Sequence, residues 1–509
     1  MLFNSFTFIF GFLPLTLAGF FIVRRIFGQN ASFGWLVAAS IFFYGWWNPQ
    51  LVLLLLGSLC GNFLIGRAIA STAEQHLRGL FVFGIVANLG LLAYFKYTDF
   101  FIGTMNDLTG VNWTLQHIIL PLGISFFTFQ QIAWLADIRR GTAHKPSFLH
   151  FTLFVTFFPQ LIAGPIVHHA EMMPQFTNRY DRSSANDLSI GVTIFGIGLF
   201  KKAVIADSMA LYSTPVFEAA VAGQVLTVVD AWGGALAYTF QIYFDFSGYS
   251  DMAIGLARMF GIILPLNFHS PYKARSIIEF WRRWHLTLSR FLRDYLYVPL
   301  GGNRHGNYRR YTNLLIVMIL GGLWHGAAWT FIIWGFLHGM LLTINHLWRA
   351  ISSAVRPQSI IIRNLGASAS LILTFLAVVI TWVFFRSANL DTATNILGAM
   401  AGMNGFVLPA VYQPLIGGLV SSLPITYSVM PLFGGGTQVV ITALLMVFVW
   451  TLPNTQELMK YVEPIVTSPS RVARTRLRIS PSWGLLLGVV AALGLCGTFS
   501  VSEFIYFQF

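Results

Sequence analysis

The chain has 509 residues, of which 56% are hydrophobic and only 10% are charged, and its formal net charge is +13. This composition excludes a chain of ordinary soluble domains, because such domains average about 25% charged residues. The two cysteines, Cys60 and Cys496, both lie in apolar runs. They therefore provide neither a disulfide framework nor a paired metal site.

Apolar runs long enough to cross a hydrocarbon core of about 30 Å recur along the chain. The first run lacks a basic start and a small-residue cleavage site, so it is predicted to be a retained span rather than a signal peptide. Several runs are short or interrupted by glycine and proline, which favours some re-entrant segments. We predict an all-α, polytopic protein of the inner membrane, with residues 1–509 forming one domain. The predicted spans are 6–23, 33–47, 50–70, 79–95, 115–135, 149–166, 188–206, 226–247, 311–326, 328–347, 367–385, 412–432, 437–452 and 483–501.

No metal or nucleotide site is predicted from the motifs. The histidines and the glutamate of "HHAE" at 168–171 have no i, i+4 pair and no third ligand nearby. The sequence contains no GxSxG elbow, P-loop or dinucleotide fingerprint. Because no soluble domain is predicted, any chemistry is expected to take place within the membrane body.

Two acidic residues stand among aromatic residues in "YTFQIYFDFSGYSDMAIGLARMFG" at 238–261. Asp245 falls at the end of a predicted span, where it could orient a histidine, pair with an arginine or cap a helix terminus. Asp251, in the same motif, is a candidate to support the site. The preceding Lys201 and Lys202 could pair with these acids, but we expect them to extend toward the interface.

Positive charge is concentrated at 268–310, where nine Lys or Arg residues accompany two acids, and again in "SRVARTRLR" at 470–478. Basic loops stay in the cytoplasm, so 268–310 and the loop 455–482 are both predicted to be cytoplasmic. Their charges bind anionic lipid headgroups, or an anionic ligand such as a coenzyme A or an acidic carrier protein. Nucleic acid is not expected, because these charges flank spans.

Residues 276–302 are predicted to form an amphipathic helix that lies at the membrane interface or lines an entrance, rather than a span. Apolar residues at 277, 280, 281, 284, 288, 291, 292 and 295 form one helical stripe. Arg282, Arg283 and Arg290 lie mostly off this stripe. His285 follows Trp284, and it is either an interfacial histidine among basic neighbours or a functional one.

The segment 313–342 contains only two ionisable side chains, His325 and His338. An ionisable residue within a span is costly and is a candidate for function. His325 lies fifteen residues beyond Arg310, so about 22 Å along a helix. A deep histidine beside small residues suits proton transfer, because its pKa is near neutrality. The alternative is a histidine that is hydrogen-bonded for helix packing.

His338 competes with His325 for this role. Thirteen residues on an unbroken helix correspond to a rotation of about 220°, so on such a helix the two histidines face apart, although a kink at Gly326 would change this. We predict that His338 is structural or supports the site.

The chain ends in "EFIYFQF". With 455–482 in the cytoplasm, the last span runs outward, and the tail 500–509 is predicted to be extracytoplasmic. Tyr506 is either part of an interfacial aromatic belt or a functional residue, and the pattern leaves both open.

Five stretches together resemble the membrane-bound O-acyltransferase (MBOAT) family, most closely its bacterial branch typified by the membrane subunit of alginate O-acetyltransferase. They are "PLGISFFTFQQIAWLADIRRG" (121–141), "FPQLIAGPIVHHAEMMPQF" (158–176), "FDFSGYSDMAIGLARMFG" (244–261), "EFWRRWHLTLSRFLRDYLYVPLGGNR" (279–304) and "LGGLWHGAAWTFIIWGFLHG" (320–339). The resemblance covers at least residues 1–400. It implies a multi-helical shell around a thinned central funnel.

The resemblance also implies roles for individual residues. The deep histidine of the family corresponds to His325, and the second functional histidine of the branch corresponds to His285. The tail is similar to an F-x-Y-x-x-F motif of some bacterial members or their partners, in which the tyrosine is thought to receive the acyl group. Phe504, Tyr506 and Phe509 occupy its three fixed positions.

The implied activity is O-acetylation of an extracytoplasmic polysaccharide such as alginate, cellulose or peptidoglycan. The expected donor is acetyl-CoA, without a metal, and His325 would take the proton of the attacking hydroxyl, with Tyr506 as a candidate. The expected partners are a periplasmic serine-hydrolase-like acetyltransferase, a polysaccharide synthesis complex and membrane lipids. A transporter or flippase is the alternative, although no inverted repeat is visible. The residues expected to position the donor are Arg282, Arg283, Arg290, Trp284, Asp245 and Trp324, together with His285.

Overall fold

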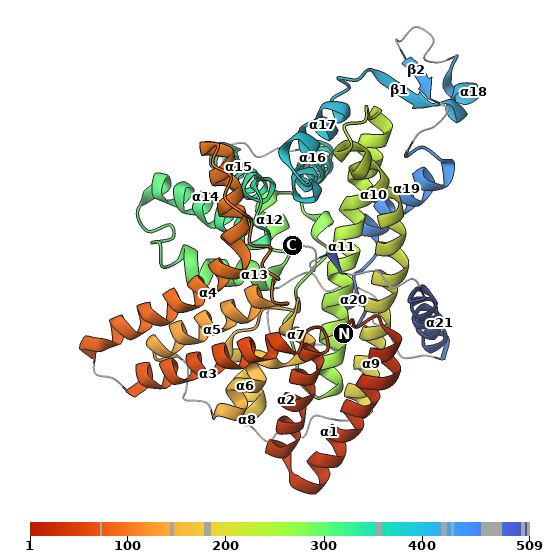
Figure 1. Cartoon of the computed structure of the whole chain (residues 1–509). Helices are drawn as coiled ribbons and strands as arrows, with labels where there is room; N and C mark the ends of the chain where they lie inside the picture. The colour runs from red at the N-terminus through yellow and green to blue at the C-terminus, as the bar shows by residue number, and fades with distance from the viewer. Residues whose placement is uncertain are drawn as a thin grey trace. The chain divides into compact units, whose positions relative to one another are not determined.

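The computed structural model describes residues 1–71, 74–142, 147–177, 185–352, 359–418, 425–428, 432–459, 481–499 and 504–505. These residues are helical almost throughout, which confirms the all-α fold class (Figure 1). Their one sheet is a parallel pair of short strands, β1 (Phe406–Pro409) and β2 (Ile425–Ser428), in which Phe406 pairs with Ile425.

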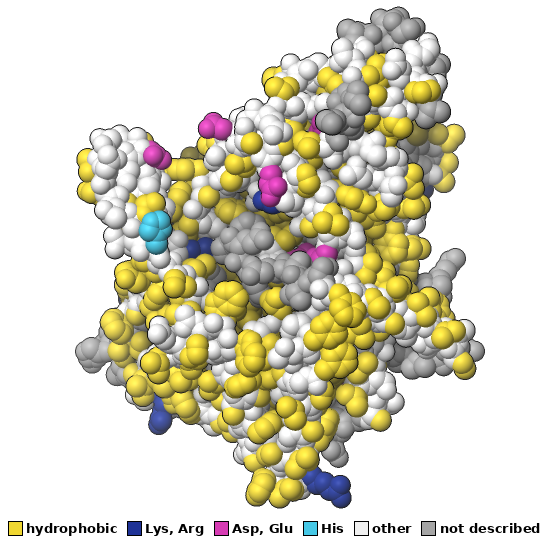
Figure 2. All heavy atoms as spheres, turned by 45° about the vertical axis from the view of Figure 1, so that its right-hand side comes forward, with side chains coloured by type: hydrophobic (Ala, Val, Ile, Leu, Met, Phe, Trp, Pro, Cys, Tyr) yellow, Lys and Arg dark blue, Asp and Glu magenta, His cyan; other side chains and the backbone are white. Residues whose placement is uncertain are grey.

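Six helical segments of the described chain are long and apolar enough to cross a membrane. Only 17% to 44% of the residues in their most apolar windows are buried inside the protein. The remaining apolar surface is visible as hydrophobic side chains across much of one face (Figure 2), and such a surface requires lipid. The chain is therefore a multi-pass membrane protein. The six segments are Thr7–Phe27, Gln50–Ser71, Leu77–Thr109, Ala185–Val221, Trp329–Ser352 and Ile360–Arg386.

The chain forms two compact units. The first comprises Met1–Ala203, Ser247–Asn267 and Thr455–Gln508, and the second comprises Val204–Phe246 and Phe268–Asn454. The helices of the first unit are η1 (Thr7–Phe12), α1 (Leu13–Phe27), α2 (Gln29–Gly45), α3 (Gln50–Ser71), α4 (Glu74–Thr109), α5 (Ile124–Arg139), α6 (Phe148–Thr156), α7 (Phe158–Leu161), α8 (His169–Thr177), α9 (Ala185–Phe200), the C-terminal part of α11 (Val228–Met259), α20 (Thr455–Leu458) and α21 (Pro481–Gly497).

Helices α9 and α11 approach each other closely within the first unit because glycines face each other. A Cβ atom on Gly198 would lie 2.6 Å from the carbonyl oxygen of Gly248, and a Cβ on Gly248 would lie 2.8 Å from that of Gly198. The same helices are joined by an ion pair, with Arg258 Nε 2.6 Å from Asp187 Oδ1. Small residues at such crossings are typical of helices that pack within membranes.

The second unit contains the segments that carry both candidate catalytic histidines. A π-helical turn, η2 (Lys201–Ala206), leads from α9 into α10. The elements of the unit are α10 (Asp207–Val221), the N-terminal part of α11, η3 (Pro271–Lys273), α12 (Ile277–Trp281), α13 (Leu286–Leu292), η4 (Arg293–Tyr297), α14 (Gly306–His325), α15 (Trp329–Ser352), α16 (Ile360–Arg386), α17 (Leu390–Met400), β1, η5 (Ala410–Tyr412), α18 (Gln413–Ile416), β2 and α19 (Gly436–Thr451).

Helices α14 and α15 form an antiparallel hairpin and lie side by side (Figure 1). A Cβ atom on Gly335 of α15 would collide with the carbonyl oxygen of Met318, and one on Gly339 would lie 3.1 Å from Leu315 Cα. The residue numbers rise on one helix as they fall on the other, so the chain reverses after His325. Helices α14 and α15 correspond to the predicted spans 311–326 and 328–347, and the unbroken helix assumed in the estimate that His325 and His338 face apart is not present.

The predicted amphipathic helix at 276–302 is broken in the structure. It consists of α12, α13 and the π-helical turn η4, and the break lies at His285, whose φ of +42° is in the left-handed region. A residue in this conformation cannot continue a right-handed helix. Of the predicted apolar stripe, all positions except half-buried Tyr295 are buried inside the protein.

Other predicted spans also differ from the structure. The described part of 412–432 contains only the end of η5, the short helix α18 and strand β2, because three prolines and two glycines interrupt its apolar sequence. In 115–135, helix α5 begins only at Ile124, after Pro121 and the left-handed Gly123. The segment 149–166 divides into α6 and α7 just before Pro159, which fits the expected re-entrant character.

Candidate active site

His325 is the last residue of α14, and its side chain is buried in a box of aromatic rings. The residue is 3% exposed. Its ring centroid lies 5.0 Å from that of Trp324, 5.2 Å from Trp334 and 5.2 Å from Phe385. The helix ends here because Gly326 adopts an extended backbone. The imidazole therefore stands at the tip of the α14–α15 hairpin, held by rigid apolar neighbours.

His285 lies at the break between α12 and α13 and is completely buried. The ring of Phe246 on α11 meets it edge to face at 4.8 Å, and Phe268 stacks with it at 6.4 Å. Burial among these rings lowers the pKa of His285 to about 3, because the charged form loses its hydration. The imidazole of His285 is therefore neutral at physiological pH.

The two histidines are neighbours in the folded protein. Their ring centroids are 6.4 Å apart and the ring planes are inclined by 58°. Trp324 contacts both rings, at 5.0 Å from His325 and 6.2 Å from His285. A reacting group placed between them would therefore meet two imidazoles, one able to take a proton and the other able to hold the group by a hydrogen bond.

His338 on α15 is held by hydrogen bonds at both ring nitrogens. Trp281 Nε1 donates to its Nδ1 at 3.3 Å, and its Nε2 lies 3.0 Å from Thr381 Oγ1. The Thr381 hydroxyl donates its own hydrogen to the carbonyl oxygen of Val378, so Nε2 of His338 carries the proton. The ring of His338 also packs on Trp334 at 4.8 Å. His338 thus supports, through Trp334, the wall that contacts His325.

Trp284 lies in the aromatic core rather than on a surface. It is 1% exposed, and its ring lies 5.0 Å from Phe268, 5.7 Å from Phe280 and 4.9 Å from Trp382. These contacts give Trp284 a structural role in the packing beneath the loop that carries His285. Donor binding at Trp284 remains a prediction.

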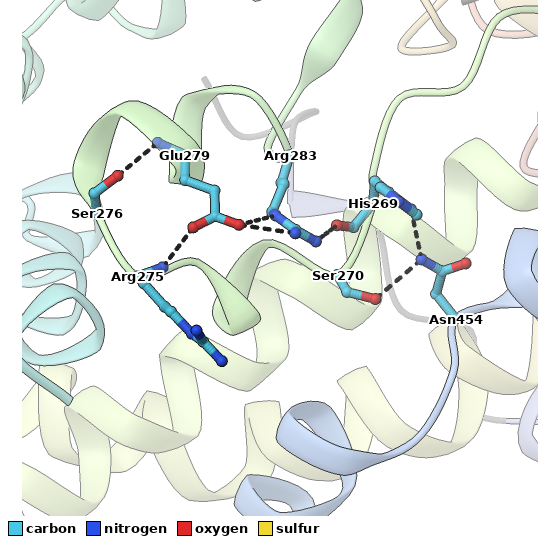
Figure 3. A network of polar contacts seen from close by, with 7 residues as sticks. All are labelled: His269, Ser270, Arg275, Ser276, Glu279, Arg283 and Asn454. Carbon is cyan, nitrogen blue, oxygen red and sulfur yellow. Dashed lines mark hydrogen bonds and ion pairs between the residues drawn. The ribbon is translucent and has the colours of Figure 1, made fainter. Parts of the chain in front are cut away.

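The three arginines expected to bind the donor differ in their surroundings. Arg283 forms an ion pair with Glu279, with Nη2 2.8 Å from Oε1, and donates from Nη1 to the carbonyl oxygen of His269 at 3.2 Å (Figure 3). The same network includes Arg275, whose backbone N–H donates to Glu279. These bonds commit Arg283 to holding the loop before α12. Arg282 is exposed and Arg290 is half-buried on α13.

Asp245 lies inside α11, which runs without interruption from Val228 to Met259. The interpretation of Asp245 as a cap at a helix terminus is therefore wrong. Its side chain is 1% exposed and belongs to the second unit, next to Phe246, whose ring contacts His285. A role for Asp245 in orienting a histidine stays a prediction.

Asp251 accepts hydrogen bonds in the first unit. Lys201 Nζ and Thr455 Oγ1 each lie 2.7 Å from its Oδ2, and Gln456 Nε2 lies 3.3 Å from its Oδ1. The expectation that Lys201 extends toward the interface is wrong, because a buried carboxylate attracts its ammonium group. Asp251 joins α11 to α20 through these bonds.

Tyr506 and Phe509 lie outside the described residues, as do 460–480 and most of 500–509. The described part of the tail is Phe504 and Ile505, which are 2% and 5% exposed. Phe504 stacks on Tyr249 of α11 at 4.5 Å within the first unit. The tail is thus anchored in the protein two residues before Tyr506.

Sequence reasoning missed three residues that enclose His325 and support its walls: Trp334, Phe385 and Thr381. Trp334 lies nine residues beyond His325 and reaches it only because α14 and α15 form a hairpin.

Among the described residues, no three His, Cys, Asp or Glu side chains cluster as metal ligands. The site therefore consists of two imidazoles within aromatic walls.

Comparisons with known proteins identify the family. Residues 135–385, which include both histidines, match the model of the membrane-bound O-acyltransferase family. The chain is 45% identical over 437 residues to a peptidoglycan O-acetyltransferase of Helicobacter pylori, covering 80% of this chain and 81% of that protein. This chain belongs to the MBOAT family. A protein of Pseudomonas putida named "probable alginate O-acetylase AlgI" is 38% identical over 517 residues, with 100% of both chains covered.

The MBOAT relatives extend to other acyl groups. A teichoic acid D-alanyltransferase of Streptococcus thermophilus is 30% identical over 242 residues, which are 46% of this chain and 58% of that protein. Membership of the family makes this chain a membrane-bound acyltransferase. The alternative of a transporter or flippase is therefore set aside.

Proposed function

We propose that this MBOAT protein takes an acetyl group from acetyl-CoA in the cytoplasm and passes it across the inner membrane for O-acetylation of an extracytoplasmic polysaccharide. The observation that carries the proposal is the pair of buried imidazoles, His285 and His325, 6.4 Å apart within one aromatic box. Relatives named as O-acetyltransferases of peptidoglycan and alginate favour an acetyl group and a glycan acceptor.

His325 acts as the general base in this proposal. As the acceptor oxygen attacks the thioester carbonyl carbon, a C–O bond forms and the hydroxyl proton passes to the imidazole of His325. The C–S bond then breaks, and the same proton returns to the departing thiolate of coenzyme A. Neutral His285 holds the reacting group by a hydrogen bond, and the surrounding rings exclude the water that would hydrolyse the thioester.

The anionic donor is expected to enter past the basic segment 268–310. Arg282 is exposed and Arg290 is half-buried beside the histidine loop, so their guanidinium groups suit the phosphates of coenzyme A. Arg283 contributes indirectly, because its ion pair with Glu279 stabilises the loop. Trp324 lines the histidine pair and would contact the thioester.

Tyr506 is the proposed first acceptor, and a periplasmic serine-hydrolase-like acetyltransferase is the proposed recipient. A phenol with an ordinary pKa of about 10 is a poor nucleophile without a base, which is the role given to His325. The resulting phenyl ester stays activated for a second transfer. Phe504, two residues before Tyr506, is buried in the first unit, so the tail is held in the protein at that point.

The test uses the purified full chain in lipid nanodiscs with acetyl-CoA labelled in its acetyl group. We expect release of the coenzyme A thiol and an acetyl ester on Tyr506, located by mass spectrometry. His325→Ala should accumulate normally and lose about 10²–10⁴-fold in rate, the usual contribution of a general base. His338→Ala should be milder. A reversed ranking of the two variants, or full activity in His325→Ala, would contradict the assignment.

A further inference from the structure

Trp334 is a buried hydrogen-bond donor in the wall of the proposed active site. It lies on α15, is 1% exposed, and meets the ring of His325 at 5.2 Å with an interplanar angle of 89°. Its indole Nε1–H has no hydrogen-bond partner among the described residues. Indole nitrogen is a donor only, so this N–H is available to an acceptor that comes within hydrogen-bond reach.

A buried donor without a partner is uncommon, because leaving it unpaired costs stability. Some tryptophans of this chain satisfy theirs: Trp281 Nε1 donates to His338, and Trp232 Nε1 donates to the carbonyl oxygen of Met400. The Nε1–H groups of Trp134, Trp382 and Trp450 have no partner among the described residues. What distinguishes Trp334 from these three is its contact with the ring of His325, so its significance lies in its place. That place is beside the proposed general base.

The indole of Trp334 is also held rigidly. Trp382 stacks on it at 5.7 Å with planes inclined by only 16°, and His338 and Phe385 pack on it at 4.8 and 5.1 Å. His338 is itself fixed by Trp281 and Thr381. A donor that is fixed before the reaction stabilises developing charge without reorganising, and aromatic walls that exclude water strengthen its effect.

We propose that Trp334 is a catalytic residue whose Nε1–H donates a hydrogen bond to the carbonyl oxygen of the transferred acetyl group; this inference rests on the acetyl transfer proposed above. As the hydroxyl oxygen attacks the carbonyl carbon, the C=O electron pair moves onto that oxygen, which becomes an oxyanion. His325 holds the hydroxyl proton at this stage. When the C=O bond re-forms and the C–S bond breaks, the negative charge leaves with the thiolate, which takes the proton back from His325.

The test uses two variants of Trp334. In the first, Trp334 is substituted by β-(3-benzothienyl)alanine, which keeps the bicyclic ring and replaces only the N–H group, with sulfur. The second variant is Trp334→Phe. With acetyl-CoA as the donor, we expect kcat to fall about 10²–10³-fold in both, as when one oxyanion donor is removed. KM for acetyl-CoA should stay close to the wild-type value, because the bond strengthens mainly in the transition state.

Trp134→Phe is the matched control. Trp134 is also 1% exposed and its Nε1–H also has no hydrogen-bond partner among the described residues, but it lies in the first unit, where its ring contacts Phe63 and Phe151. This variant reports the cost of trimming a buried indole that is not part of the proposed site, and its kcat should stay within a few fold of wild type.

The outcomes separate the proposal of acetyl transfer from acetyl-CoA from the proposal that Trp334 donates to the carbonyl oxygen. A wild-type protein that transfers no acetyl group from acetyl-CoA overturns both. An active wild type with an undiminished benzothienyl variant overturns only the role of Trp334. If Trp334→Phe loses stability, the isosteric variant still decides, and an equal loss of kcat in Trp134→Phe would reduce Trp334 to a packing residue and overturn the inference.

Discussion

The contact between α14 and α15 at Gly335 leads to a prediction about both stability and rate. In Gly335→Ala the new methyl group would collide with the Met318 carbonyl oxygen, and it would lie 3.0 Å from the Met318 carbonyl carbon and 3.1 Å from Ile319 Cα. All three atoms belong to the backbone of α14, so no side chain can rotate away, and the helices must separate. Overpacking of this kind costs about 1–3 kcal/mol.

Gly366→Ala provides a control with the opposite expected sign. Gly366 lies within α16, and a Cβ atom there would have no heavy atom within 4 Å. Replacing a helical glycine by alanine at an unobstructed position stabilises by about 0.5–1 kcal/mol. The same chemical change is thus expected to destabilise at Gly335 and to stabilise at Gly366.

The change in stability is measured by thermal unfolding in detergent, followed by intrinsic tryptophan fluorescence. The change in rate is measured as acetyl transfer at a temperature where both variants are folded. Because α14 carries His325 and α15 carries Trp334, separation of the hairpin should also slow transfer in Gly335→Ala. A Gly335→Ala protein as stable and as active as Gly366→Ala would refute the close-packed hairpin.

Three further predictions concern charge, the tail and pH. Arg282→Glu should weaken the binding of acetyl-CoA, measured by calorimetry, and the loss should be largest at low salt. Arg293→Glu is the control and should have the smaller effect, because the guanidinium of Arg293 already lies 2.7 Å from Asp294. Equal losses of affinity in the two variants would argue against a specific role for Arg282. Tyr506→Phe keeps the ring and loses only the hydroxyl, so polysaccharide acetylation in cells should be lost at normal protein levels, whereas retained acetylation would leave the tail as an anchor. Burial lowers the pKa of His285 to about 3 from an ordinary 6.5, so between these values the unfolded chain binds a proton that the folded chain excludes, and the melting temperature should fall as the pH drops from 6.5 toward 3. His285→Gln should flatten that pH dependence, and an unchanged slope would contradict the neutral, buried state of His285.

Local sequence determined the membrane character and most of the helices. Hydropathy over about 20 residues is a local property, so the predictions 50–70 and 6–23 match the spans Gln50–Ser71 and Thr7–Phe27 to within about four residues at each end. The isolated histidines at 325 and 338 could also be singled out, because an ionisable group in an apolar run is conspicuous. Proline and glycine also act locally, because they interrupt helices. The span predicted at 412–432 was wrong because the prediction gave these residues too little weight.

Tertiary structure alone decided how the site is assembled. His285 and His325 are forty residues apart in the chain, and they meet because the backbone at His285 turns left-handed and because α14 ends at His325. The left-handed turn at His285 is not visible in helical periodicity, which predicted one continuous helix over 276–302. The end of α14 was predicted by the separate spans at 311–326 and 328–347, but the packing of His325 against His285 was not. Likewise, the reversal of the chain between α14 and α15 decides whether His338 or Trp334 faces His325. Contacts between these two helices arise from tertiary packing and not from local helix propensity.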